Sequence, residues 1–359
     1  MTALAASLAN AGCRVVYVAE RMMSAERASL GWSPDGLGNA ELVVASSPDE
    51  IPSLVRAASE DSIHICSGIR SNGIIRTAQL ALVERGLRQW IIMETVDDRG
   101  MRGLAKRLIY RWKLSRMRGV TQGTLAIGRN TGKWLAGLGE PTCRIYEFSY
   151  FLPTIGELPG GDGLDGDSAF RIGFVGQLIK RKNLTLLLES LAKLGDDGVE
   201  LSVVGVGPME ESLRSEARRL LGERVRWIGR LPQKAVPGFL RSVDVLVLPS
   251  LYDGWGAVVS EALLVGTPAI CSDRCGSSGV VAASGYGGVF PSGDASALGI
   301  ALRRVVASGK LTLDARADLR DWATCLGGDA GAQYLLAILD HADGDAARPA
   351  PPWSTELFG

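Results

Sequence analysis

Two carboxylates, separated by seven residues, follow a buried apolar run in the C-terminal half of the chain. Asp253 occupies a loop, and Glu261 lies just inside a helix pattern that ends at Gly266. Four residues between them bring their backbone amides close to a helix N-terminus: Gly254, Trp255, Gly256 and Ala257. The first amides of a helix lack internal partners and the helix dipole is positive there, so they attract anions. Carboxylates beside such a loop suit a ligand with phosphates and hydroxyls, such as a nucleotide-sugar.

A basic turn lies at the start of the same half. The predicted strand Arg171–Val175 ends in a turn with three cations, Lys180, Arg181 and Lys182. We expect Asn183 to be the N-cap of the following helix, because its side chain suits that position. Cations after a strand and before a helix N-terminus form a diphosphate site in the usual crevice of such sheets. A solvated basic turn is the alternative.

Two turns follow the next two predicted strands. Gly205 and Gly207 come after Glu200–Val204, and Arg230 and Leu231 follow the next strand. Glycines let a backbone approach a ligand closely, and the second turn offers backbone groups at the same edge of the sheet. Each signal is weak alone, because a plain strand–helix turn gives the same pattern.

Strand-like apolar runs alternate with helix-period segments along the whole chain. The expected strands are Arg14–Ala19, Glu41–Ala45, Ile63–Ser67, Trp90–Met93, Thr124–Ile127, Arg144–Phe148, Arg171–Val175, Glu200–Val204, Val225–Ile228, Val243–Leu248, Pro268–Ser272 and Gly287–Phe290. Continuous apolar runs are typical of buried parallel strands, and their alternation with helices predicts two doubly wound α/β domains. The chain opens on a helix pattern, so we expect either a first domain that lacks its first strand or an incomplete start.

The boundary between the two domains is visible in the composition. Residues 153–168 are rich in glycine, proline and acids and suit an exposed linker. We therefore expect an N-terminal domain over 1–152 and a C-terminal domain over 169–328. A final helix is expected over 329–343, and the proline-containing tail 344–359 is expected to be loose.

The composition excludes several classes of protein. The net charge is zero, which gives no support to nucleic-acid binding, and 46% of the 359 residues are hydrophobic. The six widely spaced cysteines are typical of reduced thiols, and two histidines rule out a histidine-rich metal site. No apolar run reaches the length of about 18 residues that a spanning helix needs. No signal-peptide pattern opens the chain, so we expect a cytoplasmic protein.

Taken together, the motifs resemble the C-terminal, donor-binding domain of the retaining GT-B glycosyltransferases of the group 1, or family four, type. That family includes bacterial polysaccharide and phosphoinositol-mannoside transferases. The likeness runs from about residue 171 to residue 342. It rests on Gly176-Gln177-Leu178 with Lys182, Gly205-x-Gly207-Pro208, Asp253-x7-Glu261, Gly266-Thr267-Pro268 and Pro291-x-Gly293-Asp294. The order and spacing of these motifs make a specific ensemble.

The resemblance implies a role for each motif. Asp253 would contact the donor sugar, Glu261 the ribose hydroxyls and Lys182 the diphosphate. The amides of Gly254–Ala257 would hold diphosphate or sugar oxygens, and the backbone of Gly229–Leu231 would contact the base.

Two positions depart from the family pattern. The family usually has glutamate where this chain has Asp253, and often arginine where it has Gln177. One diphosphate cation is therefore missing, and Arg181 or Lys180 is expected to compensate. An impaired binding protein is the reading that these departures favour.

Two residues of the N-terminal half are candidates for the acceptor side. His64 lies in the run Ile63–Ser67, and Glu94 ends the run that begins at Trp90. Such proteins often place a histidine near the acceptor cleft, so His64 would belong there. Glu94 would orient a sugar hydroxyl or accept the proton of the acceptor. The alternatives are a structural histidine and a cap for the following turn.

The segment Arg99–Arg118 carries eight cations and no acid. Leu104, Leu108 and Trp112 are spaced by four residues, which places them on one face of a helix. A basic amphipathic helix of this kind rests on anionic lipid, and each cation near such a surface contributes about 1 kcal/mol. The alternative is a solvated surface helix.

We therefore expect a GT-B architecture, with two Rossmann-like domains facing a cleft. The function expected from it is transfer, with retention, of a sugar from a nucleoside-diphosphate sugar to a glycan or lipid-linked acceptor in cell-surface polysaccharide synthesis. Lys182 and helix amides would stabilise the leaving diphosphate, with neither a metal nor a cofactor. The expected location is cytoplasmic, with peripheral attachment to an anionic membrane surface. The other readings are a nucleotide-sugar epimerase and an impaired or truncated GT-B protein that binds nucleotide-sugar.

Overall fold

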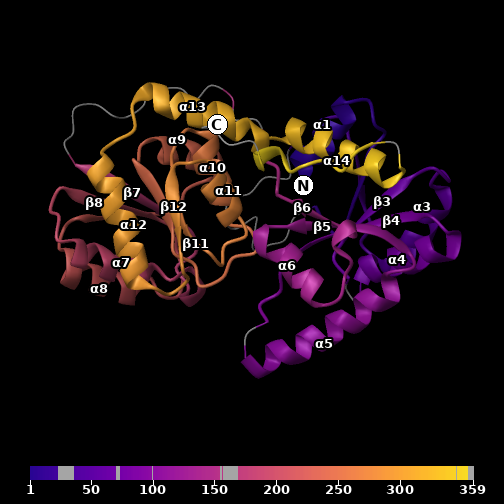
Figure 1. The fold of residues 1–359 in the computed structure, drawn as a ribbon, viewed down its shortest axis with the longest axis horizontal. Helices are drawn as coiled ribbons and strands as arrows, with labels where there is room; N and C mark the ends of the chain where they lie inside the picture. The colour runs from indigo at the N-terminus through magenta and orange to yellow at the C-terminus, as the bar shows by residue number, and fades with distance from the viewer. Residues whose placement is uncertain are drawn as a thin grey trace. The chain divides into compact units, whose positions relative to one another are not determined.

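A computed structural model of the chain describes residues 1–22, 36–69, 73–98, 100–153, 156, 169–344 and 346–354. These residues divide into two compact units, coloured in chain order in Figure 1. Within the described ranges, unit 1 comprises residues 1–22, 36–151 and 331–351, and unit 2 comprises 152–330 and 352–354. Nearly all of the predicted linker lies outside the described residues.

Unit 2 contains a six-stranded parallel sheet with the order β12-β11-β10-β7-β8-β9. Its strands are β7 (Phe170–Val175), β8 (Val199–Val204), β9 (Val225–Gly229), β10 (Val245–Leu248), β11 (Ala269–Ser272) and β12 (Gly287–Phe290). Each coincides with a predicted apolar run to within a few residues, as expected for strands that are covered on both faces.

Helices on both sides of this sheet build its core. They are α7 (Leu184–Leu194), α8 (Glu210–Leu221), α9 (Val236–Arg241), α10 (Ala257–Leu264), α11 (Ser278–Ala283), α12 (Ala295–Ser308) and α13 (Leu313–Ala323). The leucine stripe of α7 is buried against the strands together with apolar residues of α8 and α12. On the other side, α10 packs against α9 and α13. The predicted doubly wound domain is confirmed.

The start of α7 differs from the prediction. Asn183 precedes the helix, but its side chain makes no capping hydrogen bond. Its backbone is left-handed, with φ of 54°, because a short 3-10 turn over Lys180–Lys182 comes directly before it. Asparagine tolerates the left-handed conformation better than most residues, which explains why it suits position 183.

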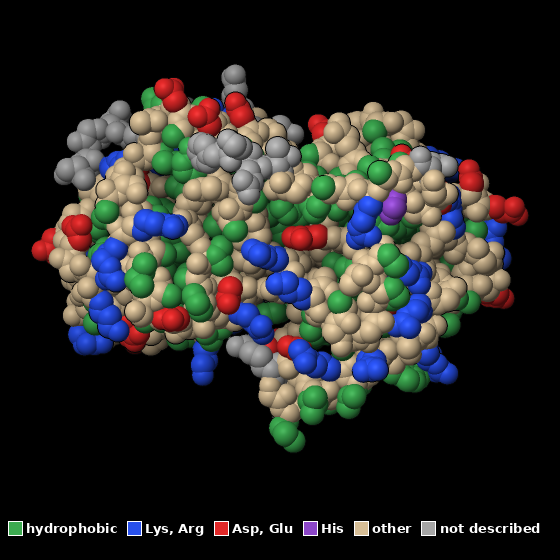
Figure 2. Space-filling view, in the orientation of Figure 1, with side chains coloured by type: hydrophobic (Ala, Val, Ile, Leu, Met, Phe, Trp, Pro, Cys, Tyr) green, Lys and Arg blue, Asp and Glu red, His purple; other side chains and the backbone are tan. Residues whose placement is uncertain are grey.

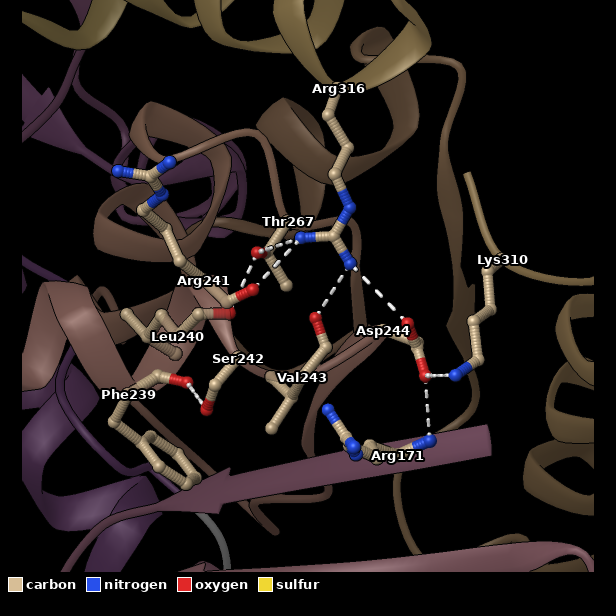
Figure 3. Close-up of polar contacts among 10 residues, drawn as sticks. All are labelled: Arg171, Phe239, Leu240, Arg241, Ser242, Val243, Asp244, Thr267, Lys310 and Arg316. Atoms are coloured by element: carbon tan, nitrogen blue, oxygen red, sulfur yellow. Dashed lines mark hydrogen bonds and ion pairs between the residues drawn. The ribbon is translucent and has the colours of Figure 1, made fainter. Parts of the chain in front are cut away.

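The amino end of the sheet carries a buried ionic cluster (Figure 3). Asp244, just before β10, accepts a hydrogen bond from the backbone N–H of Arg171 at 2.8 Å. Its other carboxylate oxygen, Oδ1, lies 3.5 Å from Nη2 of Arg316 on α13. The Nζ atom of Lys310 lies 3.7 Å from Oδ2, the oxygen that accepts from Arg171. Arg316 also donates to the carbonyl of Val243 at 2.8 Å. The cluster ties α13 to the strand ends.

Unit 1 has two parallel sheets, β1-β2 and β3-β4-β5-β6. The strands are β1 (Val16–Ala19), β2 (Glu41–Val44), β3 (Ile63–Ser67), β4 (Arg88–Glu94), β5 (Thr121–Ile127) and β6 (Ile145–Phe148). The helices are α1 (Thr2–Asn10), α3 (Ile51–Ala57), α4 (Gly73–Arg85), α5 (Gly100–Met117), α6 (Arg129–Gly137) and α14 (Gly328–Ala342). As the sequence predicts, a helix precedes the first strand.

The last helix, α14, packs on unit 1. The hydroxyl of Tyr334 donates to the carbonyl of Glu147 at 3.0 Å, and its ring stacks on Phe148. Gly331 lies so close to the ring of Phe151 that a Cβ atom would come within 2.3 Å of it. Glycine is therefore required at this contact.

The prediction of a loose tail is wrong for residues 346–354. Arg348 donates to the carbonyls of Cys143 and Ile145, and its guanidinium lies over the ring of Tyr146. Trp353 is buried. The three prolines of this segment suggested that it is loose, but Arg348 and Trp353 anchor it. Neither contact can be predicted from the local sequence.

Candidate functional site

The strand order of unit 2 locates a crevice. From β7 the chain runs outward to β8 and β9, and it then returns to place β10 and β11 on the other side of β7. The connection after β7 therefore leads to β8 on one side, and the connection after β10 leads to β11 on the other side. Ligands of such sheets bind outside the carboxyl ends of the strands at this point. The two loops at this point are the basic turn, Lys180–Lys182, and the acidic loop, residues 249–256, which carries Asp253.

An ionic cluster joins these two loops. The Nζ atom of Lys182 lies 2.5 Å from Oδ2 of Asp253, and Nη1 of Arg181 lies 3.4 Å from Oδ1. Ser250 donates a hydrogen bond to Oδ2 at 3.3 Å. The Lys182 and Asp253 side chains remain 13% and 12% exposed, and that of Arg181 is 41% exposed. The two cations thus meet one carboxylate beyond the carboxyl ends of β7 and β10, in reach of solvent.

Backbone contacts fix the geometry of this pair. The N–H of Leu251 donates to the carbonyl of Arg181 at 2.8 Å, and Nη1 of Arg181 donates to the carbonyl of Tyr252 at 3.0 Å. The stem of Lys182 runs along Gly176, whose Cβ position would be 3.5 Å from Cε. The lysine is therefore directed across the end of β7 toward the acidic loop.

The acidic loop is also held from its far side. The N–H of Asp253 donates to the carbonyl of Arg274, and the N–H of Gly276 donates to the carbonyl of Asp253, both at 3.1 Å. Gly256 adopts φ of 85°, and a Cβ there would lie 2.8 Å from the Leu248 side chain. Glycine is required for both reasons. Ala257 begins α10 directly after it.

Of the four residues predicted to supply amides, Trp255 has a second role. Its indole is 2% exposed and donates through Nε1 to Oγ of Ser260 at 3.0 Å. It also packs near Trp353, with ring centroids 6.4 Å apart. The Trp255 side chain therefore belongs to the core, and a ligand can contact this residue only through its backbone. Gly254 lies beside it on the loop and is partly exposed.

Ser277 is a residue that the sequence analysis missed. Within the described part of the chain, its buried Oγ atom has no hydrogen-bond partner. The Cβ position of Gly256 is 3.4 Å from this oxygen. A buried polar atom without a partner is costly and is uncommon in native structures. The serine lies in the small-residue run Gly276–Ser278, which carried no recognisable signal.

Glu261 lies on α10 as predicted, with buried neighbours on either side. The residue is only partly buried, but burial raises the pKa of its carboxyl to about 7. Desolvation favours the neutral acid, so the group exchanges its proton near neutral pH. When the Glu261 carboxyl group is ionised, both of its oxygens can accept hydrogen bonds from hydroxyl groups.

The two predicted glycines after β8 have a structural explanation. A Cβ on Gly205 would lie 1.9 Å from the carbonyl oxygen of Gly176, and one on Gly207 would lie 2.5 Å from that of Leu178. The N–H of Leu178 donates to the carbonyl of Val206 at 3.0 Å. The glycines thus let two loops of this chain approach each other, whereas the sequence suggested an approach to a ligand.

The remaining donor-side candidates lie on adjoining loops. Gln177 follows β7 and is partly exposed; Arg230, after β9, is exposed, and Leu231 is partly exposed. The N–H of Gly205 donates to the carbonyl of Gly229 at 2.7 Å, which brings the loops after β8 and β9 together. All three residues therefore follow strand carboxyl ends on the same edge of the sheet.

In unit 1 the two candidates occupy opposite ends of the sheet. Glu94 ends β4, where it pairs with Ile127 of β5 at the carboxyl end. His64 is the second residue of β3 and pairs with Gln89 near the start of β4. Five residues of strand, or about 16 Å, separate Gln89 from Glu94.

His64, which the sequence analysis assigned to the acceptor side, therefore lies at the opposite end of the sheet from Glu94. Its Nε2 atom lies 2.9 Å from Oγ of Ser62, and burial, with a smaller effect of Arg85, lowers its pKa. The structural reading of this histidine is the one that the geometry favours.

The described residues contain no group of three or more histidine, cysteine or acidic side chains arranged to hold a metal ion. Cys271 and Cys275, both buried, are free thiols. No described helix is long and apolar enough to cross a membrane.

Comparisons with known proteins agree with the geometry of unit 2. Residues 165–322 match the family model described as glycosyl transferases group 1. The chain is 33% identical over 161 residues to a phosphatidyl-myo-inositol mannosyltransferase of Mycobacterium leprae, covering 41% of this chain and 42% of that protein. It is 32% identical over 164 residues to the putative glycosyltransferase EpsF of Bacillus subtilis, covering 41% of each. The chain thus spans less than half of the length of these relatives.

Solved structures extend the likeness in fold to nearly the whole chain. A crystal structure of Anabaena Alr3699/HepE in complex with UDP and glucose superposes with a TM-score of 0.69 at 14% identity, covering 94% of this chain and 95% of that one. The lipopolysaccharide outer core galactosyltransferase WaaB gives 0.70 at 16% identity, covering 95% and 94%. The predicted fold class, GT-B with two Rossmann-like domains, is confirmed. Residues 165–322, which carry the ionic cluster and Glu261, match the model of the glycosyl transferases group 1 family, the family that the motifs resemble.

Proposed function

We propose that this chain transfers a sugar from a nucleoside-diphosphate sugar to a glycan or lipid-linked acceptor, with retention of the anomeric configuration, in cell-surface polysaccharide synthesis. The observation that carries the proposal is the ionic cluster of Lys182, Arg181 and Asp253 at the point where the strand order reverses. The family match over the same residues supports it.

Lys182 and Arg181 are the groups that would neutralise the diphosphate of the donor. Both cations contact Asp253, which holds them beyond the carboxyl ends of β7 and β10. A diphosphate is a stronger anion than one carboxylate, and it would compete for the same cations. Asp253 would then be released to accept a hydrogen bond from a hydroxyl of the donor sugar. Its short side chain limits how far from the loop this sugar can lie.

Glu261 is assigned to the ribose hydroxyls of the donor. It lies one helical turn into α10, beyond the loop amides that would hold diphosphate or sugar oxygens. Because the pKa of Glu261 is raised, part of this group is protonated near neutral pH. Ribose hydroxyls that donate hydrogen bonds to the ionised form would stabilise it, so Glu261 would release a proton when the nucleotide-sugar binds. Arg181 and Lys182 supply positive charge without a metal, and the reaction needs no cofactor.

The transfer step follows from these groups. The bond between the anomeric carbon and the diphosphate oxygen breaks, and a bond from the same face forms to the acceptor hydroxyl oxygen. The acceptor proton passes to the leaving phosphate oxygen. Lys182 stabilises the charge that develops on that oxygen, a preorganised effect worth about 3–4 kcal/mol for one group. Glu94, at the carboxyl end of the unit 1 sheet, is proposed to orient the acceptor.

A thermal-shift screen against UDP-, GDP-, ADP- and TDP-sugars tests the donor site. We expect one nucleotide to raise the melting temperature of the chain by several degrees, and Lys182→Met and Glu261→Gln to remove the shift. Lys180→Met and Glu216→Gln are matched controls, because Lys180 is exposed beside Lys182 and Glu216 lies on α8. Absence of a shift with every donor would contradict the assignment.

The shifted donor is then incubated with acceptor glycans and lipid extracts. A new glycoside with the anomeric configuration of the donor supports the proposal. Interconversion of the free donor into another nucleotide-sugar would indicate an epimerase. A donor that binds but reacts in neither way would indicate a binding protein.

A further inference from the structure

Helix α5 of unit 1 has two apolar faces on opposite sides. At 100° per residue, Tyr110, Leu114 and Met117 lie on one side, and Leu104, Leu108 and Trp112 lie on the other. Leu114 is buried, with Tyr110 and Met117 packed against the same core as Trp134 of α6. This inner face already accounts for the attachment of the helix to the unit.

The outer face is exposed along the helix. Its apolar side chains are Met101 (88% exposed), Leu104 (61%), Leu108 (64%), Ile109 (51%) and Trp112 (56%). Figure 2 shows hydrophobic side chains at the lower end of the view, where Figure 1 places α5, with lysine and arginine side chains beside them. Single exposed apolar residues are common, but a continuous row of this kind indicates an interaction surface.

The base of the helix is firmly held. A Cβ on Gly103 would lie 1.7 Å from the carbonyl oxygen of Asp98, so glycine is required for the preceding loop to fold back on α5. Asp98 pairs with Arg107 at 2.5 Å and accepts from Nε1 of Trp134 at 3.0 Å. These contacts keep the outer face presented to solvent.

The cations of the segment divide into two groups. Four cations are engaged within the unit. Lys106 and Lys113 donate to the carbonyls of Asp97 and Ile69. Arg107 pairs with Asp98, and Arg118 pairs with Glu140. Arg111 and Arg116 flank the outer face on either side, and the guanidinium of Arg116 lies over the ring of Trp112 at 4.6 Å. Arg99 and the side chain of Arg102 lie outside the described residues.

We infer that the outer face of α5 docks on the surface of an anionic lipid bilayer. An apolar row flanked by arginines, with no acid anywhere in Arg99–Arg118, matches acyl chains bordered by negatively charged headgroups. A second copy of this chain fits poorly, because two such faces would bring like charges together. The inference goes beyond the proposed function and does not rest on it.

Vesicle co-sedimentation of the full chain tests the inference. We expect binding to vesicles of phosphatidylcholine mixed with phosphatidylglycerol, weak binding to phosphatidylcholine alone, and loss of binding at high salt. Leu108→Ser with Trp112→Ser should weaken binding about tenfold or more, because the inserted apolar area is lost. Arg111→Glu with Arg116→Glu should weaken it by a similar factor through charge.

Matched controls lie on exposed helix surfaces of unit 2. Ile300→Ser with Leu313→Ser removes two apolar side chains of similar exposure, and Arg218→Glu with Arg219→Glu reverses two exposed arginines of α8. Both pairs should bind vesicles as the parent chain does. All variants are compared by melting temperature to exclude unfolding.

Three outcomes would overturn the inference. One is equal binding to neutral and anionic vesicles, and another is binding that survives both α5 double substitutions. The third is self-association without lipid that the Leu108 and Trp112 substitutions abolish, measured by sedimentation velocity, since the occupant would then be a second copy.

Discussion

The two ends of the unit 2 sheet each carry one aspartate with one lysine and one arginine, and the two clusters differ in burial. At the amino end Asp244, Arg316 and Lys310 meet beneath α13 (Figure 3). At the carboxyl end Asp253 meets Lys182 and Arg181 across the gap between two loops. The Asp244 side chain is fully buried, whereas the Asp253 side chain keeps 12% of its surface exposed.

Burial decides which of the two clusters can exchange partners. Asp244 is committed to a backbone N–H of β7, and Arg316 is committed to the carbonyl oxygen of Val243. A ligand cannot displace these bonds without unfolding the strand ends. The Lys182–Asp253 pair joins two loops and keeps contact with solvent, and in the proposed function a diphosphate replaces the carboxylate there. The same residue types would then serve stability at one end and binding at the other.

Asp244→Ala should give the largest change in stability. Removing the carboxylate leaves Arg316 buried without its counter-charge, and breaking a buried pair costs about 3–5 kcal/mol. The free energy of unfolding is measured by urea denaturation. Lys310→Met is the control, because this lysine is partly exposed and its loss should cost under about 1 kcal/mol. Equal costs for the two variants would contradict the contrast in burial.

Lys182→Met should leave the fold nearly intact and remove activity. If the cation stabilises the leaving diphosphate, kcat should fall by about 10²–10³. The change in melting temperature should remain small, because Asp253 keeps Arg181 and solvent as partners. Transfer assays with the donor found in the thermal-shift screen measure the loss. Full activity in Lys182→Met together with loss of activity in Lys180→Met would assign the diphosphate to Lys180 in place of Lys182.

Glu261 should make stability depend on pH. Its pKa is raised from 4.5 to about 7 in the folded chain, so the folded state binds the proton more tightly than the unfolded state. The contribution of Glu261 to the free energy of unfolding is then largest below about pH 4.5 and is lost as the pH rises through about 7, by about 1.4 kcal/mol per unit of pKa shift. Because Glu261 is partly exposed, the total should be about 1–3 kcal/mol.

The comparison of wild type with Glu261→Gln across pH 5 to 8 isolates this effect. The glutamine does not titrate, so the difference between the two melting temperatures should change with pH and level off above pH 7 to 8. Glu216→Gln, on α8, should show no such trend. A constant difference between wild type and Glu261→Gln would show that the carboxyl group is not desolvated.

The smallest effect is expected at His64. This residue lies at the amino end of its sheet, as Asp244 does in unit 2, and it bonds to Ser62. His64→Gln should therefore change kcat by less than about twofold, a shift within the range of ordinary surface substitutions. Glu94→Gln, at the carboxyl end, should lower it by about 10²-fold if Glu94 positions the acceptor. A larger loss of kcat in His64→Gln than in Glu94→Gln would move the acceptor site to the amino end of the unit 1 sheet.

The strands and loops of this fold were largely predictable. Strand runs such as Thr124–Ile127 and Glu200–Val204 are marked by local apolar character, and the carboxyl-end loops follow from them. The left-handed Asn183 and the anchored tail around Trp353 were not, because each depends on a contact that local patterns do not encode. His64 was assigned to the acceptor side by family likeness, although the predicted run Ile63–Ser67 already placed it near the amino end of its strand.

The alternation of strands and helices could be predicted from the sequence, as could the loops that carry Asp253 and Lys182 and the helix that carries Glu261. These properties depend on hydrophobic period and on residue order, which are local. Three features follow from tertiary contacts instead: Asp244 is buried while Asp253 keeps contact with solvent, Gly205 serves a backbone contact, and the buried Ser277 Oγ finds no hydrogen-bond partner among the described residues. Burial and hydrogen bonding are set by residues about 70 positions away in the chain, as for Lys182 and Asp253, and no local pattern contains them.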